Sequence, residues 1–147
     1  MHTCTRNPVG RAYLHAELAT SGPLAATTTR IRRRVLTPQD VAIACARIAH
    51  DLKAEDILIL DLRTLTQITD YFVLATGASE HQLKAIADKL QSDLKQQHVG
   101  KLGIEGDPVS GWVLLDYCDV VVHLFGPEAR AFYELEMLWG DAPRIPW

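Results

Sequence analysis

Residues 111–139 read GWVLLDYCDVVVHLFGPEARAFYELEMLW. Two apolar runs separated by a short polar turn predict a β-hairpin, with strands over residues 112–117 and 119–125. The glycine–proline pair that follows opens a helix predicted to end at Trp139. Burying an ionisable side chain is costly unless it has a partner. In this stretch Asp116, Asp119, His123 and Glu136 lie among large apolar residues. Whether their partners lie inside or outside the molecule is therefore the functional question.

Upstream of the hairpin, helical and extended patterns alternate. Thr37, Pro38 and Asp40 have the pattern of a helix start closed by a capping box. Ser79 and Gln82 repeat that pattern, and Gly100 is placed to end the second helix. The other predicted elements are strands over 57–62, 71–76 and 102–105, and coil over 141–147. This order predicts an α/β fold, a mixed β-sheet of about five strands with flanking helices.

Length and composition are those of an ordinary globular domain. The chain has 147 residues, of which 48% are apolar and 22% charged. No apolar run approaches the roughly 20 residues that a membrane-spanning helix needs. The three cysteines are odd in number and widely spaced. They favour neither a disulfide framework nor a zinc site, which predicts a reducing, cytoplasmic setting.

Charge divides the chain into two unequal parts. Residues 1–36 carry six arginines and one glutamate, whereas the remainder has a net charge of -8. We interpret residues 1–36 as a flexible basic extension, residues 37–143 as the folded domain and residues 144–147 as a tail. A transit peptide to a mitochondrion or plastid, or a start codon assigned too far upstream, are alternatives for the extension. The acidic body disfavours naked nucleic acid and favours a basic protein surface.

Two patterns raise the possibility of phosphate or nucleotide chemistry. Residues 76–79 turn from a strand into a helix, where backbone N–H groups can hold a phosphate, although a strand end followed by a helix cap explains the same residues. Asp116 and Asp119 are candidate metal ligands of a nucleotidyl transferase. They flank a tight turn with no lysine or arginine beside them, which favours carboxylates that cap the turn or bind a partner.

The remaining nucleophiles and metal-ligand types give no catalytic pattern. A single histidine within a strand, His123, is typical of a hydrogen-bonded structural residue. Cys118 lies between acidic residues, which raise a thiol pKa and disfavour a nucleophile. No histidine or cysteine spacing fits a metal site. We therefore expect no enzymatic activity, no metal and no cofactor.

Strand alternation gathers the unusual hairpin residues on one side of the predicted sheet. If helices cover the opposite side, this face is aromatic, apolar and partly acidic. It would carry Trp112, Leu114, Asp116, Asp119, Val121 and His123. Burial within a core is the alternative. The charged side chains favour an interface, because a core would leave them without partners.

Several segments resemble the iojap-like family of ribosomal silencing factors, in the family's order and spacing. They include ITDYFVLATG at 68–77, DVVVH at 119–123 and RAFYELEMLWGDA at 130–142. The resemblance covers about residues 37–143. It implies a nucleotidyltransferase-like fold without transferase activity. It also implies binding to large-subunit ribosomal protein fourteen, which blocks a bridge to the small subunit and represses translation. Relatives in organelles imply an alternative role in large-subunit assembly.

The resemblance and the hairpin pattern together predict a partner-binding site. Its residues are Trp112, Leu114, Asp116, Tyr117, Asp119 and His123, with Glu136 and Trp139 at the edge. Arg130, Phe132 and Tyr133 are expected to brace the last helix against the sheet. The chain departs from the family at Cys118, where glycine is usual, so a left-handed backbone there would strain the turn. We further expect a monomer or weak homodimer, no membrane association, and at most a minor ribosomal RNA contact by the basic extension.

Overall fold

The first helix of the computed structural model, which describes residues 35–147, begins as its sequence predicts. Helix α2 spans Pro38–Asp51. The Thr37 hydroxyl accepts a hydrogen bond from the Asp40 backbone N–H at 3.1 Å, and the Asp40 carboxylate accepts one from the Thr37 N–H at 3.0 Å. This reciprocal capping box pairs N–H groups that the first helical turn leaves without intrahelical partners. The basic extension lies outside the described residues, apart from Val35 and Leu36.

Helix α3 spans Glu80–Gln96 and is capped by Ser79 as predicted, but its capping box and its last residue differ from the prediction. Ser79 caps the Gln82 backbone N–H at 3.1 Å. The Gln82 side chain accepts instead from Ala78 N–H at 2.6 Å and donates to the Leu52 carbonyl at 2.9 Å. The predicted capping box is therefore only half formed. Gly100 was the wrong terminator, because His98 takes the left-handed conformation (φ 61) two residues earlier.

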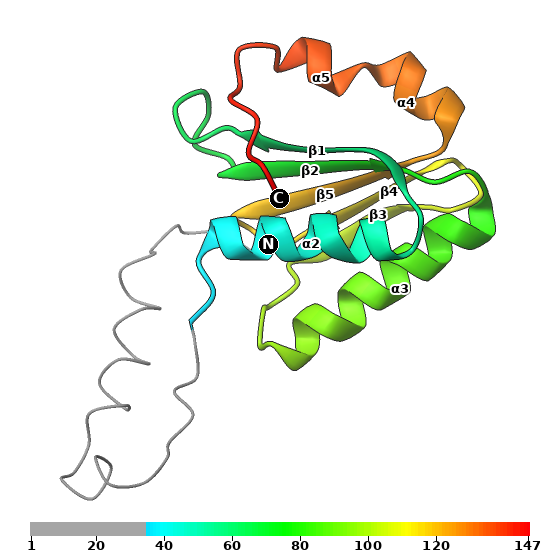
Figure 1. The fold of residues 1–147 in the computed structure, drawn as a ribbon, viewed down its shortest axis with the longest axis horizontal. Helices are drawn as coiled ribbons and strands as arrows, with labels where there is room; N and C mark the ends of the chain where they lie inside the picture. Colours follow the sequence, from blue (N-terminus) through cyan, green and yellow to red (C-terminus); the bar gives the residue numbers. More distant parts are fainter. Residues whose placement is uncertain (1–34) are drawn as a thin grey trace, which may run out of the picture.

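Five strands form one mixed sheet, as predicted, and their order in it is β1-β2-β5-β4-β3. Strands β2 and β5 are parallel, and all other neighbours are antiparallel. Helices α2 and α3 lie on one face of the sheet, and α4 (Pro127–Tyr133) and α5 (Leu135–Leu138) lie on the other (Figure 1). The strands are β1 (Glu55–Asp61), β2 (Tyr71–Thr76), β3 (Gly103–Asp107), β4 (Trp112–Asp116) and β5 (Val120–Phe125).

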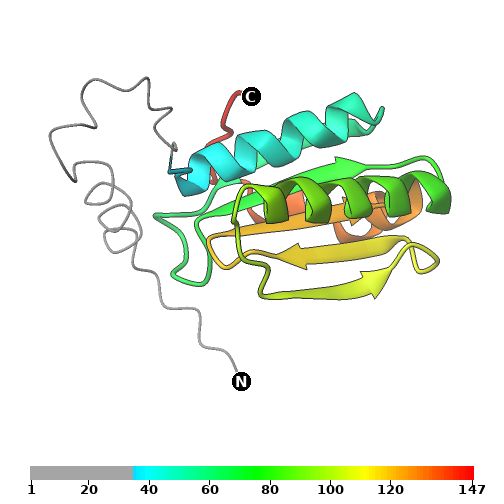
Figure 2. The same ribbon diagram turned by 90° about the horizontal axis from the view of Figure 1, so that it is seen from below.

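The larger core lies between the sheet and helices α2 and α3 (Figure 2). Ile86, Leu90 and Leu94 of α3 are fully buried, as are Val73 and Leu115 from the sheet. Fully burying such side chains stabilises the fold by roughly 1.5–3 kcal/mol each. Among residues 35–147, no helix is both long and apolar enough to cross a lipid bilayer.

The predicted final helix is broken in two. Helix α4 spans Pro127–Tyr133 and α5 spans Leu135–Leu138, with Glu134 between them in the left-handed conformation (φ 47). The prediction of one helix to Trp139 is therefore wrong. Phe132, expected to be buried, is 79% exposed. A helical repeat counted through residue 134 does not hold, because the break changes the direction of the chain.

The carboxyl-terminal tail lies against the edge strand β1. The Asp61 N–H donates to the Pro143 carbonyl at 2.8 Å, and the Ile145 N–H donates to the Ile59 carbonyl at 2.9 Å. An isolated antiparallel bridge joins Arg144 to Leu60. Residues 144–147 include no regular strand, but this pairing satisfies backbone groups that an open sheet edge would expose.

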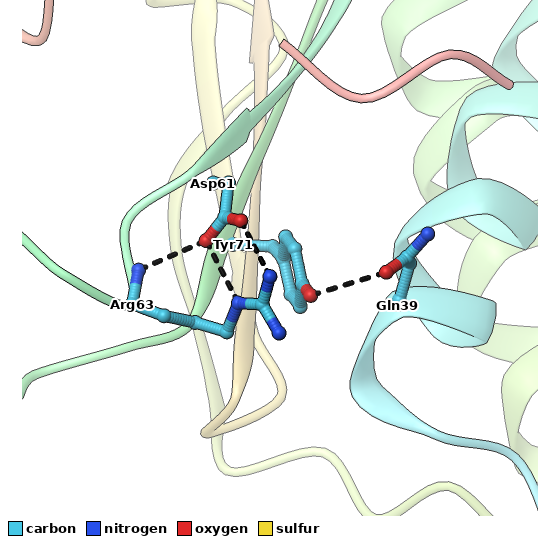
Figure 3. Close-up of polar contacts among 4 residues, drawn as sticks. All are labelled: Gln39, Asp61, Arg63 and Tyr71. Atoms are coloured by element: carbon cyan, nitrogen blue, oxygen red, sulfur yellow. Dashed lines mark hydrogen bonds and ion pairs between the residues drawn. The ribbon is translucent and has the colours of Figure 1, made fainter. Parts of the chain in front are cut away.

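A polar cluster anchors the loop that joins β1 to β2 (Figure 3). The Asp61 carboxylate accepts hydrogen bonds from the backbone N–H, Nε and Nη2 of Arg63, at 3.0, 2.9 and 2.7 Å. These bonds hold the pKa of Asp61 below its usual value. The Arg63 guanidinium also lies 5.4 Å from the centre of the Tyr71 ring, and Tyr71 reaches Gln39 of α2 at 3.4 Å. Arg63 thus fixes the start of the loop to the sheet, and Tyr71 joins the sheet to α2.

Candidate functional site

Alternation along β4 creates a surface on the sheet face opposite α2 and α3. Trp112, Leu114 and Asp116 are partly exposed, while the intervening Val113 and Leu115 are buried against the helices. Strand β3 pairs with β4 so that Glu105 lies opposite Leu114, and Glu105 is exposed. We call the surface formed by these four residues, Trp112, Leu114, Asp116 and Glu105, the open face.

Trp112 is held by aromatic rings from two directions. Its ring centre lies 5.5 Å from that of Phe125 and 4.5 Å from that of Tyr133 on α4. Its indole N–H donates to Nδ1 of His123 at 3.2 Å. A partly exposed tryptophan fixed in this way loses little conformational entropy on binding, which is typical of an interface anchor.

His123 lies beneath the open face and is 4% exposed. Its ring contacts Phe72 edge-on at 4.6 Å and lies parallel to Phe125 at 5.9 Å. Burial lowers the pKa of His123 to about 4, so the imidazole is neutral at pH 7. The expectation of a hydrogen-bonded strand histidine is confirmed.

The turn between β4 and β5 places Asp116 and Asp119. Cys118 has the left-handed conformation that its sequence position suggested (φ 74). One oxygen of Asp116 caps the Cys118 N–H at 2.8 Å, and the Asp119 carbonyl accepts from Asp70 and Tyr71 at 2.9 and 3.0 Å.

Arg130 joins α4 and α5 to the end of β2. Its guanidinium donates to the Thr76 hydroxyl at 2.9 Å and to both oxygens of Glu136 at 3.3 Å. Arg130 is 7% exposed. The expectation that Arg130 and Tyr133 brace this segment is confirmed, whereas Phe132 takes no part. Glu136, predicted at the edge of the site, has an internal partner, and Trp139 packs against Phe72 at 5.9 Å.

Two predicted contact residues are not at the surface. Tyr117 is 3% exposed and lies in the core beneath α2 and α3, because the alternation of β4 continues through it. Burial raises its pKa to about 12. His123 is on the predicted face but is covered. The structure thus brings Trp112, Leu114 and Asp116 together on one face and removes Tyr117 from it.

The local geometry explains the residues that suggested phosphate or metal chemistry. The Gly77 and Ala78 N–H groups, which would have to hold a phosphate, donate to the Phe125 carbonyl at 2.8 Å and to Gln82. Asp116 serves as a turn cap. Among residues 35–147, no three histidine, cysteine, aspartate or glutamate side chains converge in a metal-ligating arrangement.

Comparison with known families extends over the whole described part of the chain. A family model described as "Ribosomal silencing factor during starvation" matches residues 35–147. The chain belongs to the ribosomal silencing factor family. The match includes the carboxyl-terminal tail that pairs with β1.

Relatives of this silencing-factor chain occur in bacteria and in organelles. The ribosomal silencing factor of Halalkalibacterium halodurans is 37% identical over 110 residues, covering 75% of this chain and 94% of that protein. The chloroplastic protein Iojap of Arabidopsis thaliana is 39% identical, with 71% and 43% covered. A mouse protein named for mitochondrial assembly of the ribosomal large subunit is 36% identical, with 58% and 39% covered.

A solved structure from Chromobacterium violaceum has the same fold as this silencing-factor domain. Its TM-score is 0.68 at 38% sequence identity, and the similarity covers 71% of this chain and 88% of that chain. The mixed α/β sheet with flanking helices is thus common to both. The nucleotidyltransferase-like character of the fold stays a prediction.

Glu105 is the one open-face residue that the sequence patterns did not identify. Glu105 joins the open face only through the register of β3 with β4. Tyr133 contacts Trp112 only because α4 crosses the second sheet face. Side chains alternate between the two faces along residues 103–107, so pairing β3 with β4 was enough to place Glu105 on the open face. Tyr133 was expected to brace the last helix, but no local signal predicted its contact with Trp112.

Replacing Arg130 by methionine is expected to destabilise this silencing-factor domain by about 2 kcal/mol. Methionine fills part of the space but leaves Thr76 and Glu136 without their donor. Chemical denaturation monitored by circular dichroism measures the change. Lys84→Met is the matched control, because Lys84 pairs with Asp88 on an exposed face of α3. An equal loss in both variants would contradict a bracing role for Arg130.

Proposed function

We propose that this chain binds the large ribosomal subunit through the open face and keeps the small subunit from joining. The partner we propose is large-subunit ribosomal protein fourteen, next to an intersubunit bridge. Translation is repressed by steric exclusion, with no bond made or broken. The observation that best supports this role is a partly exposed Trp112, held by internal contacts on the same face of β4 as Asp116, in a chain of the silencing-factor family.

Charge complementarity supports a basic ribosomal partner. Residues 35–147 carry a net charge of -8. Two carboxylates of the open face lie near Leu114: Glu105 is opposite it on β3, and Asp116 is two residues further along β4. Opposite charge across an interface increases the association rate more than it increases affinity. The basic extension, residues 1–36, is proposed to add at most a minor contact with ribosomal RNA.

The direct test is sucrose-gradient co-sedimentation with separated ribosomal subunits. We expect the full chain to sediment with large subunits, not with small ones, and to prevent their joining when both are mixed. A chain beginning at residue 37 should retain this behaviour if the domain supplies the contact. Equal binding to both subunits, or unimpeded joining at saturating protein, would contradict the proposal.

Replacing Asp116 by asparagine is expected to weaken large-subunit binding about threefold to tenfold and to reduce its salt dependence. Asparagine keeps an oxygen that accepts from Cys118 N–H, so the turn is retained while the charge is lost. Binding is measured between low and physiological salt. Asp88→Asn on α3 is the control, since Asp88 lies on an exposed helix surface. Equal effects of the two variants would show that only net charge matters.

A role in large-subunit assembly is the second candidate. The name of the mouse relative supports it. Gradient profiles of cells lacking the protein distinguish the roles. Immature large subunits would indicate assembly, whereas excess joined ribosomes during starvation would indicate silencing. For a bacterial member the cytoplasm is the proposed location, and a mitochondrion or plastid is the alternative if residues 1–36 act as a transit peptide.

A further inference from the structure

The hydrogen bond between Trp112 and His123 leaves one polar atom unsatisfied. The indole nitrogen of Trp112 can only donate, so Nδ1 of His123 must accept, and the neutral imidazole carries its proton on Nε2. Nε2 is buried and has no hydrogen-bond partner among the described residues. A buried donor without an acceptor destabilises a fold. A phenylalanine at this position would fill similar space without that defect.

Aromatic side chains already fill the surroundings of His123. Phe72 and Phe125 contact the imidazole from β2 and β5, and the main-chain register places Leu74 and Leu114 on either side. Apolar packing therefore does not require an imidazole. The feature that distinguishes histidine from phenylalanine here is the Nδ1 acceptor, and its donor is Trp112.

We propose that His123 is a positioning residue for the docking surface: its Nδ1 fixes the indole of Trp112 so that the exposed part of the ring is apolar. The partner group opposite Trp112 then needs no hydrogen-bond acceptor. An aliphatic side chain has the matching chemistry, and a lysine or arginine elsewhere on the same basic surface can pair with Asp116. The expected effect on large-subunit affinity rests on the proposed function. The expected orientation of the Trp112 indole does not.

Two substitutions separate the acceptor from the rest of the side chain. His123→Phe keeps an aromatic ring and removes both the acceptor and the unpaired donor. His123→Asn is smaller but offers an oxygen close to the position of Nδ1. Nuclear magnetic resonance measures hydrogen exchange of the Trp112 indole N–H, whose signal is identified by its absence in Trp112→Phe. Large-subunit co-sedimentation measures affinity, and denaturation measures stability.

For His123→Phe we expect unchanged or increased stability and exchange of the Trp112 indole N–H about tenfold faster or more. We expect its affinity for large subunits to be roughly tenfold weaker, because the freed N–H must lose its water on binding. For His123→Asn we expect slow indole exchange and affinity within about threefold of wild type, despite lower stability. If affinity followed the stability of the fold alone, the order would be reversed: His123→Asn, the less stable variant, would bind large subunits more weakly than His123→Phe.

Wild-type exchange in His123→Phe would overturn the inference, as would fast exchange with unchanged affinity. Failure of the wild-type chain to bind large subunits has a different meaning. It would contradict the proposed function, while the indole exchange of the two variants would still decide whether His123 holds Trp112.

Discussion

Replacing Trp112 by alanine is expected to weaken large-subunit binding by about 3 kcal/mol, a loss of more than a hundredfold in affinity. The indole is the largest side chain of the open face, and its contacts with Phe125, His123 and Tyr133 hold it ready for a partner. Alanine removes the apolar anchor and also loosens Tyr133. Co-sedimentation over a range of protein concentrations gives the change in Kd.

Trp147→Ala provides the matched control for this prediction. Trp147 is also partly exposed, but it packs against His50 of α2 at 5.4 Å, away from the open face. The Trp147→Ala variant should bind large subunits with wild-type affinity. Wild-type affinity in Trp112→Ala, with its fold confirmed by circular dichroism, would exclude the open face as the docking site.

Acid is expected to destabilise the domain through His123, by about 3 kcal/mol between neutral pH and pH 4. The pKa of His123 is about 4 in the folded protein, against an ordinary value of 6.5. Above pH 6.5 the imidazole is neutral in both states. As the pH falls from 6.5 to 4 the unfolded chain takes up the proton first, so stability is lost across this interval and not below it.

Denaturant titrations at a series of pH values test this expectation, with His123→Phe as the control. Carboxylates titrate in both proteins, so the difference between the two curves isolates the imidazole. The side chains that contact His123 are apolar or aromatic, and Asp116 is the nearest acidic residue on the same face of β4. Parallel curves for the two proteins would show that His123 is not the acid-labile group.

Local patterns predicted much of the fold because each is a local physical requirement. Thr37 and Asp40 close their capping box whatever the rest of the chain does. The apolar run 71–76 coincides with β2, and the alternation of 112–116 separates a buried from a partly exposed side. Hairpin geometry also placed Trp112 and Asp116 on one face of the sheet, as expected.

The failed expectations involve residues whose environment is set by distant parts of the chain. Tyr117 continues an alternating strand, and only the helix layer on its side decides that it is core. Phe132 is exposed because α4 turns Arg130 and Tyr133 toward the sheet, and Glu134 ends that helix. Gly100 does not end α3, because His98 adopts the left-handed conformation two residues earlier.

The amino-acid sequence by itself determined the strands and most helix starts, the acidic character of the body and the family resemblance, because caps, periodicity and charge act over a few residues. Tertiary structure alone decided which side of each strand meets a helix layer. It thereby separated Trp112 and Asp116, which stay accessible, from Tyr117 and His123, which do not. Burial depends on which layers pack together, so side chains that are close together in the hairpin differ: some are accessible and others are buried.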